Sequence, residues 1–435
     1  MTPKDTVKRV SLLSVLGLMY ASMCGGPYGM EDYVAKVGPG LFILILFATP
    51  WVWGIPTALA SAELSTKRPV AGGYYRWVQI YLGDFWGSQA GTWSLFSSFL
   101  DNALYPVLFA RVLVHVVPGM TRFEQWLAAV AFIAVLTYLN YRGIQVAGGV
   151  AVALNLFLVL PLFWLVGAAL LGPVVNPLIP FQAPGADLWT QLGTGLALSM
   201  WLYSGYYEVS TAAEEIENPA RNIPHAIALV TPLVVLSYAL PTIAGLMAFG
   251  QWETWTSGQF VTIGYALGGP GLGGWLFLGS VASYAVIFLA YLVWWSRLAW
   301  SMSAEGDLPA FLHNLHPRHG TPHRVLVIYA LIYAAMATLP FEDLLVADTW
   351  LAGAYTLLVH GALVRSRSLE PGAGGFRVPG GRIGLWINTL VPASVFVMLL
   401  VFTDREQVPL CLAFLLAGPL LYLARRLLRP AVRMR

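Results

Sequence analysis

Long apolar segments recur from one end of the chain to the other, each about 20 residues in length, which is the length of one helical membrane crossing. Transmembrane β-strands alternate apolar and polar residues, whereas segments such as 156–171 and 395–402 show no alternation. Only 10% of the residues are Asp, Glu, Lys or Arg, against about 25% in a soluble domain. The sequence therefore predicts an all-α integral membrane protein and excludes a water-soluble globule.

Charges, prolines and glycines divide the chain into about 12 expected transmembrane helices. They run near 10–33, 41–64, 85–113, 124–140, 146–172, 189–215, 223–249, 272–300, 323–340, 343–364, 384–402 and 407–428. With the N-terminus inside, all but four of the 24 Lys and Arg residues lie on the inner side, the exceptions being Lys36, Arg111, Arg122 and Arg405. This asymmetry predicts a multi-pass protein of the cell membrane with both termini cytoplasmic. The expected partners are the lipid bilayer and a small molecule; we find no nucleic-acid patch and infer no obligate protein partner.

Glycine and proline interrupt the first and the sixth expected spans. Residues 25–29 read Gly-Gly-Pro-Tyr-Gly, and residues 203–207 read Tyr-Ser-Gly-Tyr-Tyr. Glycine frees the backbone and proline removes a hydrogen-bond donor, so a continuous helix is disfavoured at the first site and less severely at the second. Two broken helices at corresponding positions of two halves indicate a transporter binding site. The plainer alternative is that Gly and Pro are common in membrane helices generally.

Five acidic residues lie within or beside the apolar segments: Glu31, Asp32, Asp101, Glu208 and Asp348. A charged side chain at a helix centre costs about 2.5–3.5 kcal/mol on insertion scales, and the Lys and Arg residues cluster at helix ends, where they cannot neutralise these acids. The missing positive charge is therefore expected from a cationic substrate or from protons. As alternatives, Glu31 and Asp32 could lie in headgroup water, Asp101 could be a hydrogen-bond anchor, and Asp348 is expected to be a charge in the outer vestibule.

Aromatic side chains lie close to these acids in the sequence. A carboxylate beside aromatic faces suits an alkyl ammonium group, because each cation–π contact contributes about 0.5–2 kcal/mol. Tyr284 is an expected wall of the same site, with ordinary packing as its alternative. The candidate substrate site comprises Gly25, Gly26, Tyr28, Gly29, Glu31, Asp101, Tyr105, Trp201, Tyr203, Glu208 and Tyr284.

Several short motifs resemble those of the amino acid–polyamine–organocation superfamily. They are Ala-Glu-Leu-Ser at 62–65, Ala-Gly-Gly-Tyr at 71–74, Glu-Glu-Ile-Glu-Asn-Pro at 214–219 and Ile-Pro-His-Ala at 223–226. Residues 25–32 and 101–107 are similar to the branch that contains plant and protozoan polyamine uptake transporters. The resemblance extends from about residue 10 to residue 380.

This resemblance implies a leucine-transporter-like fold with broken helices 1 and 6. Helices 1–5 (residues 1–172) and 6–10 (residues 173–367) would form a 5+5 inverted repeat, with peripheral helices 11–12 and a basic tail in 368–435. It implies proton-coupled uptake of polyamines such as putrescine or spermidine, with the proton as coupling ion and no other cofactor. Asp101 and Glu208 are the expected proton carriers.

Two departures from the family pattern bear on the substrate. Amino-acid-specific relatives hold the substrate carboxylate on free amides of the first break, whereas Pro27 removes one amide here and Glu31 lies nearby. Many relatives also carry Gly-Phe-Glu in span six, whereas Glu208 falls one residue later, about 100° further around an ideal helix. A cationic or neutral amino acid transporter or exchanger on the same fold, and more remotely a non-transporting receptor, remain the alternatives. An enzyme is not expected, because no catalytic motif occurs at a plausible position.

Polar residues near the inner helix ends have a separate interpretation. Glu63, Glu214 and Glu215 are expected either to form ion pairs of an inner gate or to be solvated at the interface. Four histidines lie at 313, 316, 319 and 323, but proline and glycine interrupt their spacing and no further ligand completes a set, so we expect no metal site. Cys24 and Cys411 lie in apolar segments near opposite ends, and no disulfide is expected between them.

Overall fold

The computed structural model describes residues 11–172, 174–185, 187–372 and 375–428, and every regular element in this part of the chain is a helix, without a strand. The expected all-α class is therefore confirmed, while the basic segment 1–9 and the end of the basic tail fall outside the described residues. The helices are α1 (Leu12–Met23), α2 (Glu31–Val37), α3 (Pro39–Thr49), the π turn η2 (Pro50–Gly54), α4 (Ile55–Lys67), α5 (Gly73–Leu82), α6 (Asp84–Val116), α7 (Arg122–Tyr141), α8 (Ile144–Leu170), α9 (Leu188–Leu202), η3 (Glu208–Glu215), α10 (Pro219–Phe249), η4 (Trp252–Thr254), α11 (Gln259–Ala304), η5 (Ala310–His313), α12 (His323–Met336), α13 (Phe341–Leu369), α14 (Gly381–Phe402) and α15 (Val408–Leu428).

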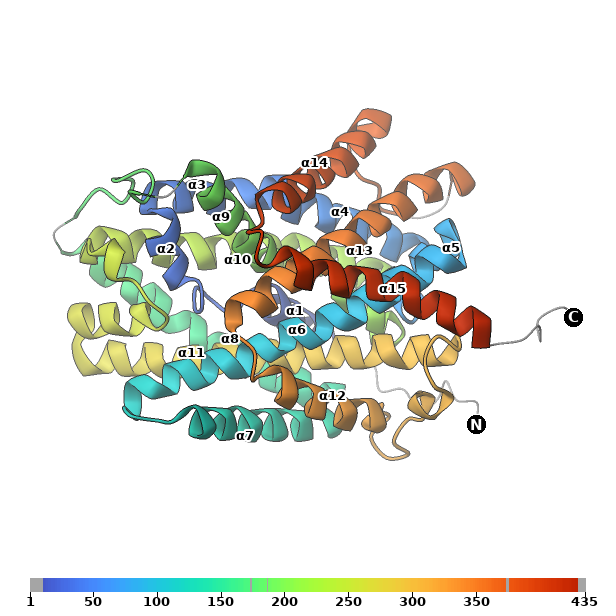
Figure 1. Cartoon of the computed structure of the whole chain (residues 1–435), viewed down its shortest axis with the longest axis horizontal. Helices are drawn as coiled ribbons and strands as arrows, with labels where there is room; N and C mark the ends of the chain where they lie inside the picture. Colours follow the sequence, from blue (N-terminus) through green and yellow to red (C-terminus); the bar gives the residue numbers. More distant parts are fainter. Residues whose placement is uncertain (1–10, 173, 186, 373–374, 429–435) are drawn as a thin grey trace, which may run out of the picture.

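Eight helical segments in the described part are long and apolar enough to cross a membrane. They are 39–67, 122–141, 144–170, 219–249, 259–304, 341–369, 381–402 and 408–427. Two shorter apolar helices, α1 and α12, accompany them. Figure 1 shows these helices as an elongated bundle whose long members run along its length.

Several boundaries differ from those expected. The span predicted at 41–64 lies within a helical stretch from residue 39 to 67, because Pro50 begins a π turn and does not end the helix. Helix α11 consists of two helices that meet at a kink at Gly268 and Gly269, where the φ values are −132° and +61°, and the span predicted at 272–300 lies in the second of them. Helix α5 was not predicted at all. Its ten residues bury only one side, so it has no long apolar run.

Both predicted helix breaks are present. Residues 24–30 separate α1 from α2, and Gly26 and Gly29 within them adopt φ values of +84° and +90°. Residues 203–207 separate α9 from η3, and Gly205 has φ of +91°. The second break touches the last turn of α1, next to the first break, because a Cβ on Gly205 would lie 2.6 Å from the backbone oxygen of Ser22. Glycine is therefore required at this crossing.

The broken helices are enclosed by longer ones. Helix α1 packs against α8, α10 and α11, and α6 packs between α13 and α11 (Figure 1). Helices α14 and α15 lie outside this group, α14 against α9 and α13 and α15 against α6 and α13. The core of the bundle is thus formed around the two breaks, and the last two helices cover one side of it.

Candidate functional site

Three carboxyl groups from distant parts of the chain meet in the bundle core. Asp101 on α6, Glu208 at the start of η3 and Asp348 on α13 are 3%, 1% and 4% exposed. Asp348 interacts electrostatically with both of the others. None of the ion pairs in the described part of the chain includes any of the three. We call these residues the carboxyl cluster.

Asp101 accepts two hydrogen bonds on the same oxygen. Tyr105, one turn further along α6, donates from its hydroxyl over 3.1 Å, and Trp201 donates from Nε1 over 2.5 Å. Trp201 is the residue before the last in α9 and lies two positions before the second break. The rings of Tyr105 and Trp201 are stacked with centroids 6.1 Å apart. Asp101 thus anchors α6 to the broken helix, and its carboxyl also faces an aromatic wall.

Glu208 is held by two tyrosines from other helices. Tyr74 on α5 donates to Oε2 over 3.1 Å, and Tyr355 on α13 donates to Oε1 over 3.3 Å. The Tyr74 and Tyr355 rings are stacked at 5.6 Å, and Tyr207 packs against both. Tyr74 belongs to the Ala-Gly-Gly-Tyr motif, in which a Cβ on Gly73 would lie 2.0 Å from Ser210 Oγ of η3. The motif therefore lets α5 approach η3 closely enough for Tyr74 to reach Glu208.

Asp348 is not a charge of the outer vestibule, and that expectation is wrong. Its carboxyl is buried and accepts a hydrogen bond from Ser97 of α6. Ser97 lies one turn before Asp101 on α6, and Asp348 lies two turns before Tyr355 on α13. Residues at such spacings share a helix face. Two facing helices therefore each contribute a carboxyl and a hydroxyl to the same cluster.

Glu31 is also buried, so its alternative placement in headgroup water is wrong. Its side chain is 0% exposed, and its two oxygens accept from the backbone amides of Gly29 over 2.7 Å and of Gly258 over 3.3 Å. Gly258 is the residue before α11. A buried oxygen of Asp32, Oδ1, has no hydrogen-bond partner. Residues 31 and 32 form a second acidic region, which we call the first-break acids.

The two acidic regions border different turns of α11. Tyr284 interacts electrostatically with the first-break acids, and Tyr291 with all three members of the carboxyl cluster. Seven residues of helix span about 10 Å. The expected convergence of Asp101 and Glu208 is therefore present, whereas Glu31 lies in a separate region along the same helix.

A small cavity lies at the first break between these regions. Its volume is about 20 Å³, room for about one water molecule. The predicted site residues Gly25, Gly26, Tyr28, Tyr105 and Trp201 line it, together with Tyr238 and Tyr291. A substrate larger than water therefore needs the surrounding helices to move apart.

Four residues of the predicted substrate site, namely Gly25, Gly29, Tyr203 and Tyr284, differ in what they contact. A Cβ on Gly25 would lie 2.3 Å from Ile287, so the glycine permits close packing on α11, and Gly29 supplies an amide to Glu31. The buried hydroxyl of Tyr284 has no hydrogen-bond partner. Tyr203 donates to the backbone oxygen of Leu46 over 2.9 Å, so its hydroxyl serves the packing of α9 on α3 in this conformation.

Two conservative substitutions distinguish the hydrogen bond that Trp201 donates to Asp101 from the one that Tyr203 donates to Leu46. Trp201→Phe removes the Nε1 donor to Asp101, and we expect uptake per folded molecule to fall at least tenfold, because a hydrogen bond to a charged group contributes about 1.5–3 kcal/mol. Tyr203→Phe removes a neutral bond to Leu46 and is expected to lower stability by about 0.5–1.5 kcal/mol while leaving uptake unchanged. Radiolabelled uptake and thermal unfolding of both variants check this. A Tyr203→Phe variant with impaired uptake and normal stability would contradict the assignment.

Two further cavities lie outside the core. The larger one, about 470 Å³, is lined by residues of α2, α9 and α13, by the last residue of α14 and by the segment after it. Four acidic residues line it against a single lysine, Lys36: they are Glu342, Asp343, Asp404 and Glu406. A cavity with excess negative charge raises the local concentration of cations. We call it the acidic vestibule.

The helix ends that carry Glu63 and Glu215 hold ion pairs. Glu63 has a fully buried side chain, which pairs with Arg367 at 2.6 Å and Lys67 at 3.2 Å and accepts from the amide of Val378. Glu215 pairs with Arg297 of α11. Plain interfacial solvation is therefore wrong for Glu63, whereas the side chain of Glu214 lies outside the described part. The pairs join α4 to α13 and η3 to α11.

Interrupted helices that enclose a buried polar site within an apolar helical bundle are the architecture of secondary transporters. The sequence model of the amino acid permease family matches residues 10–403, and the chain belongs to this family. It is thus a multi-pass membrane protein of a permease family and not of an enzyme family.

The chain is also similar over most of its length to curated transporters. A probable polyamine transporter of Arabidopsis thaliana is 32% identical, over 96% of this chain and 84% of the relative. A polyamine transporter of the same plant is 31% identical, over 95% and 84%. A polyamine transporter of Oryza sativa subsp. japonica is 32% identical, over 97% and 79%.

Proposed function

We propose that the protein imports polyamines, linear cations of the putrescine and spermidine type, and that an inward proton gradient drives the uptake. The observation that carries this proposal is the carboxyl cluster, whose three buried acids have no cationic partner in the described chain. Buried charge requires compensation. Ammonium groups of a substrate, or protons, supply it. The names of the plant relatives support the same substrate class.

The arrangement of the two acidic regions favours a substrate with amines at both ends. One ammonium group would approach the carboxyl cluster and another the first-break acids, about 10 Å along α11. Tyr28, Tyr105 and Trp201, which line the cavity between them, would pack against the methylene spacer. Pro27 at the break has no amide to offer an α-carboxylate. An α-amino acid therefore matches this site less well than a diamine does.

Proton coupling follows from the same charges. Without substrate, protons on the cluster reduce repulsion among the three acids, and an arriving ammonium group makes those protons unnecessary. Proton and substrate occupancy then bias the equilibrium between outward- and inward-open states by their differential affinities. Asp101 and Glu208 are the proposed proton carriers, and the position of Asp348 adds a third candidate.

We further propose how this activity is arranged in the membrane. Twelve spans would comprise a 5+5 inverted repeat, residues 1–172 and 173–367, with 368–435 peripheral. The packing of α14 and α15 outside the core supports the peripheral part. Both termini would face the cytoplasm and the acidic vestibule the outside, where its charge would gather cations. The protein would lie in the cell membrane and use no cofactor besides the proton.

Uptake by purified protein in liposomes tests the function. We expect labelled spermidine or putrescine to accumulate, and accumulation to increase several-fold when the inside is alkaline relative to the outside. Excess unlabelled putrescine should compete more strongly than arginine or lysine. Uptake unaffected by collapse of the proton gradient would remove the coupling, and stronger competition by arginine would favour a cationic amino acid transporter.

A further inference from the structure

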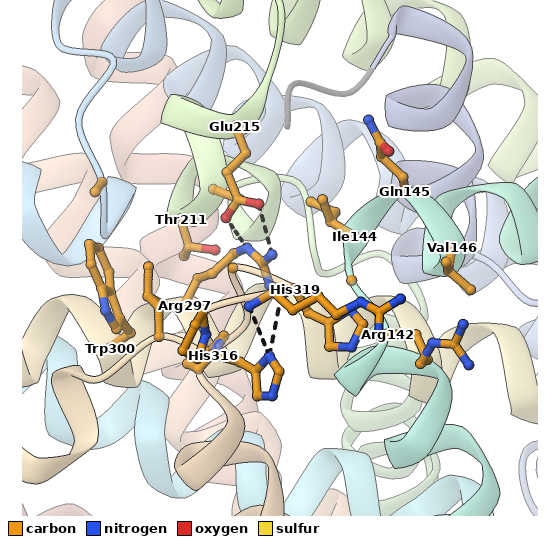
Figure 2. A pocket seen from close by; sticks show the side chains of 18 residues that line it. Arg142, Ile144, Gln145, Val146, Thr211, Glu215, Arg297, Trp300, His316 and His319 are labelled. Carbon is orange, nitrogen blue, oxygen red and sulfur yellow. Dashed lines mark hydrogen bonds and ion pairs between the residues drawn. The ribbon is translucent and has the colours of Figure 1, made fainter. Parts of the chain in front are cut away.

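The third cavity lies at the end of the bundle that we place in the cytoplasm, next to the Arg297–Glu215 ion pair (Figure 2). Its volume is about 330 Å³, and 18 described residues line it. They come from the turn between α7 and α8, the start of α8, η3, α11 and the segment before α12, together with Ala71. Small-molecule sites commonly have volumes of about 300–1,000 Å³. The cavity is therefore large enough for a small ligand.

Basic side chains dominate its lining. Arg142, Arg297 and Arg318 are present, whereas Glu215 is the single acidic residue among the 18. Glu215 is already engaged, since its Oε2 accepts from Arg297 Nη2 over 2.8 Å. Neither Arg142 nor Arg318 belongs to an ion pair in the described part of the chain. With every histidine neutral, three arginines and one glutamate leave a net charge of +2 in the lining.

Two histidines extend this basic lining. His316 Nδ1 accepts from the backbone amides of Arg318 over 3.2 Å and His319 over 3.3 Å. A neutral imidazole that accepts at Nδ1 carries its hydrogen on Nε2, which makes His316 a donor. The His316 and His319 rings are stacked at 4.8 Å and pack against Tyr141. Contacts within the protein thus hold the His316 and His319 rings in place in the segment before α12.

Basic residues are common at cytoplasmic helix ends, where they usually face open water or lipid headgroups. Here they also line a hollow: Arg297 is buried, whereas Arg142 and Arg318 are exposed, and Arg142 Nη1 donates to the Tyr138 hydroxyl over 3.1 Å. Figure 2 shows Arg297, His316 and His319 between Trp300 on one side and Arg142 on the other. A positively charged hollow disfavours a polyamine. It suits an anion, and guanidinium groups bind phosphate through paired hydrogen bonds.

We propose that this cavity is a binding site for phosphate groups, supplied by a small soluble anion or by a lipid headgroup. Arg142 and Arg318 would provide the charge that no protein carboxylate neutralises, and His316 a further donor. Glu215 in the wall ends η3, whose first residue, Glu208, belongs to the carboxyl cluster. The anion would therefore lie against an element of the proposed substrate site. Its binding does not depend on which substrate is transported.

The test uses the full chain in phosphatidylcholine nanodiscs, with pyrophosphate as the probe and no polyamine present. We expect saturable calorimetric binding at one site per chain, weakened at least tenfold in the double variant Arg142→Gln/Arg318→Gln. The matched control Arg382→Gln changes an exposed arginine at the start of α14 and should bind as the wild type does. Thermal unfolding verifies that each variant is folded.

A second experiment tests whether the phosphate group that binds in the cavity belongs to a lipid headgroup. Nanodiscs containing phosphatidylglycerol, without pyrophosphate, are analysed by native mass spectrometry. Retention of this lipid by the wild type and the Arg382→Gln variant, with loss from the double variant, would assign the site to a headgroup and support the proposal. Equal pyrophosphate binding and equal lipid retention in the wild type and the folded double variant, or neither ligand bound by the wild type, would overturn it.

Discussion

Asp101→Asn is expected to reduce polyamine uptake by at least tenfold while leaving the protein folded. Asparagine keeps an oxygen that can accept from Tyr105 and Trp201, so the hydrogen bonds that join α6 to α9 are retained. The charge is lost, and a hydrogen bond to a charged group contributes about 1.5–3 kcal/mol, which corresponds to roughly 10- to 150-fold in affinity. Spermidine binding and uptake by the purified variant, together with its thermal unfolding, measure the effect.

The matched control for this variant is Asp84→Asn, which changes an exposed aspartate in the first turn of the same helix. It should transport as the wild type does. If Asp101→Asn binds spermidine with wild-type affinity, Asp101 is only the hydrogen-bond anchor that links α6 to α9, and the carboxyl cluster is not the substrate site.

Glu208→Gln is expected to flatten the pH dependence of uptake. In the wild type, uptake should rise as the outside becomes more acidic than the inside, because protons enter with substrate. Glutamine can accept from one of Tyr74 and Tyr355 at its amide oxygen and can donate to the hydroxyl of the other from its amide nitrogen, because the two tyrosines bond to different oxygens of Glu208. It cannot exchange a proton, so net transport against a gradient should fall at least tenfold while exchange of internal for external substrate persists. Uptake measured across a series of imposed pH gradients, with and without internal spermidine, distinguishes net transport from exchange.

The exposed Glu253 in η4 supplies the control for this measurement. Glu253→Gln should keep the wild-type pH profile. An unchanged profile in Glu208→Gln would move the proton site to Asp101 or Asp348, and the corresponding asparagine variants would then be compared in the same assay.

The two helix breaks and the all-α class could be predicted from the sequence, because each depends on residues that are close together in the chain. The breaks at 24–30 and 203–207 follow from glycine and proline, because these residues change which backbone conformations are allowed wherever they occur. The all-α class follows from the apolar runs in the same way. Helix α5 could not be predicted in this way. It has only ten residues and buries only one side, so it lacks the long apolar run that indicates a transmembrane helix.

Tyr105 and Gly29 lie within four residues of the acids that they contact, but the other partners could not be predicted because they lie far away in the sequence. Ser97 and Asp348 are separated by 251 positions, and Glu31 and Gly258 by 227. The closeness of Asp348 to the acidic start of α13 predicts a position in the outer vestibule, whereas its carboxyl is buried. Its seven-residue spacing from Tyr355 was the available signal for a shared buried face. Sequence position alone does not give depth in the bundle, which packing between helices decides.

A structure determined with bound spermidine tests the central claim most directly. We predict that the helices around the first break move apart, with one ammonium nitrogen within hydrogen-bonding distance of a carboxyl oxygen of Asp101, Glu208 or Asp348, and another near Glu31. Spermidine bound elsewhere, with the cluster acids matched to protein cations or turned toward bulk water, would contradict the account.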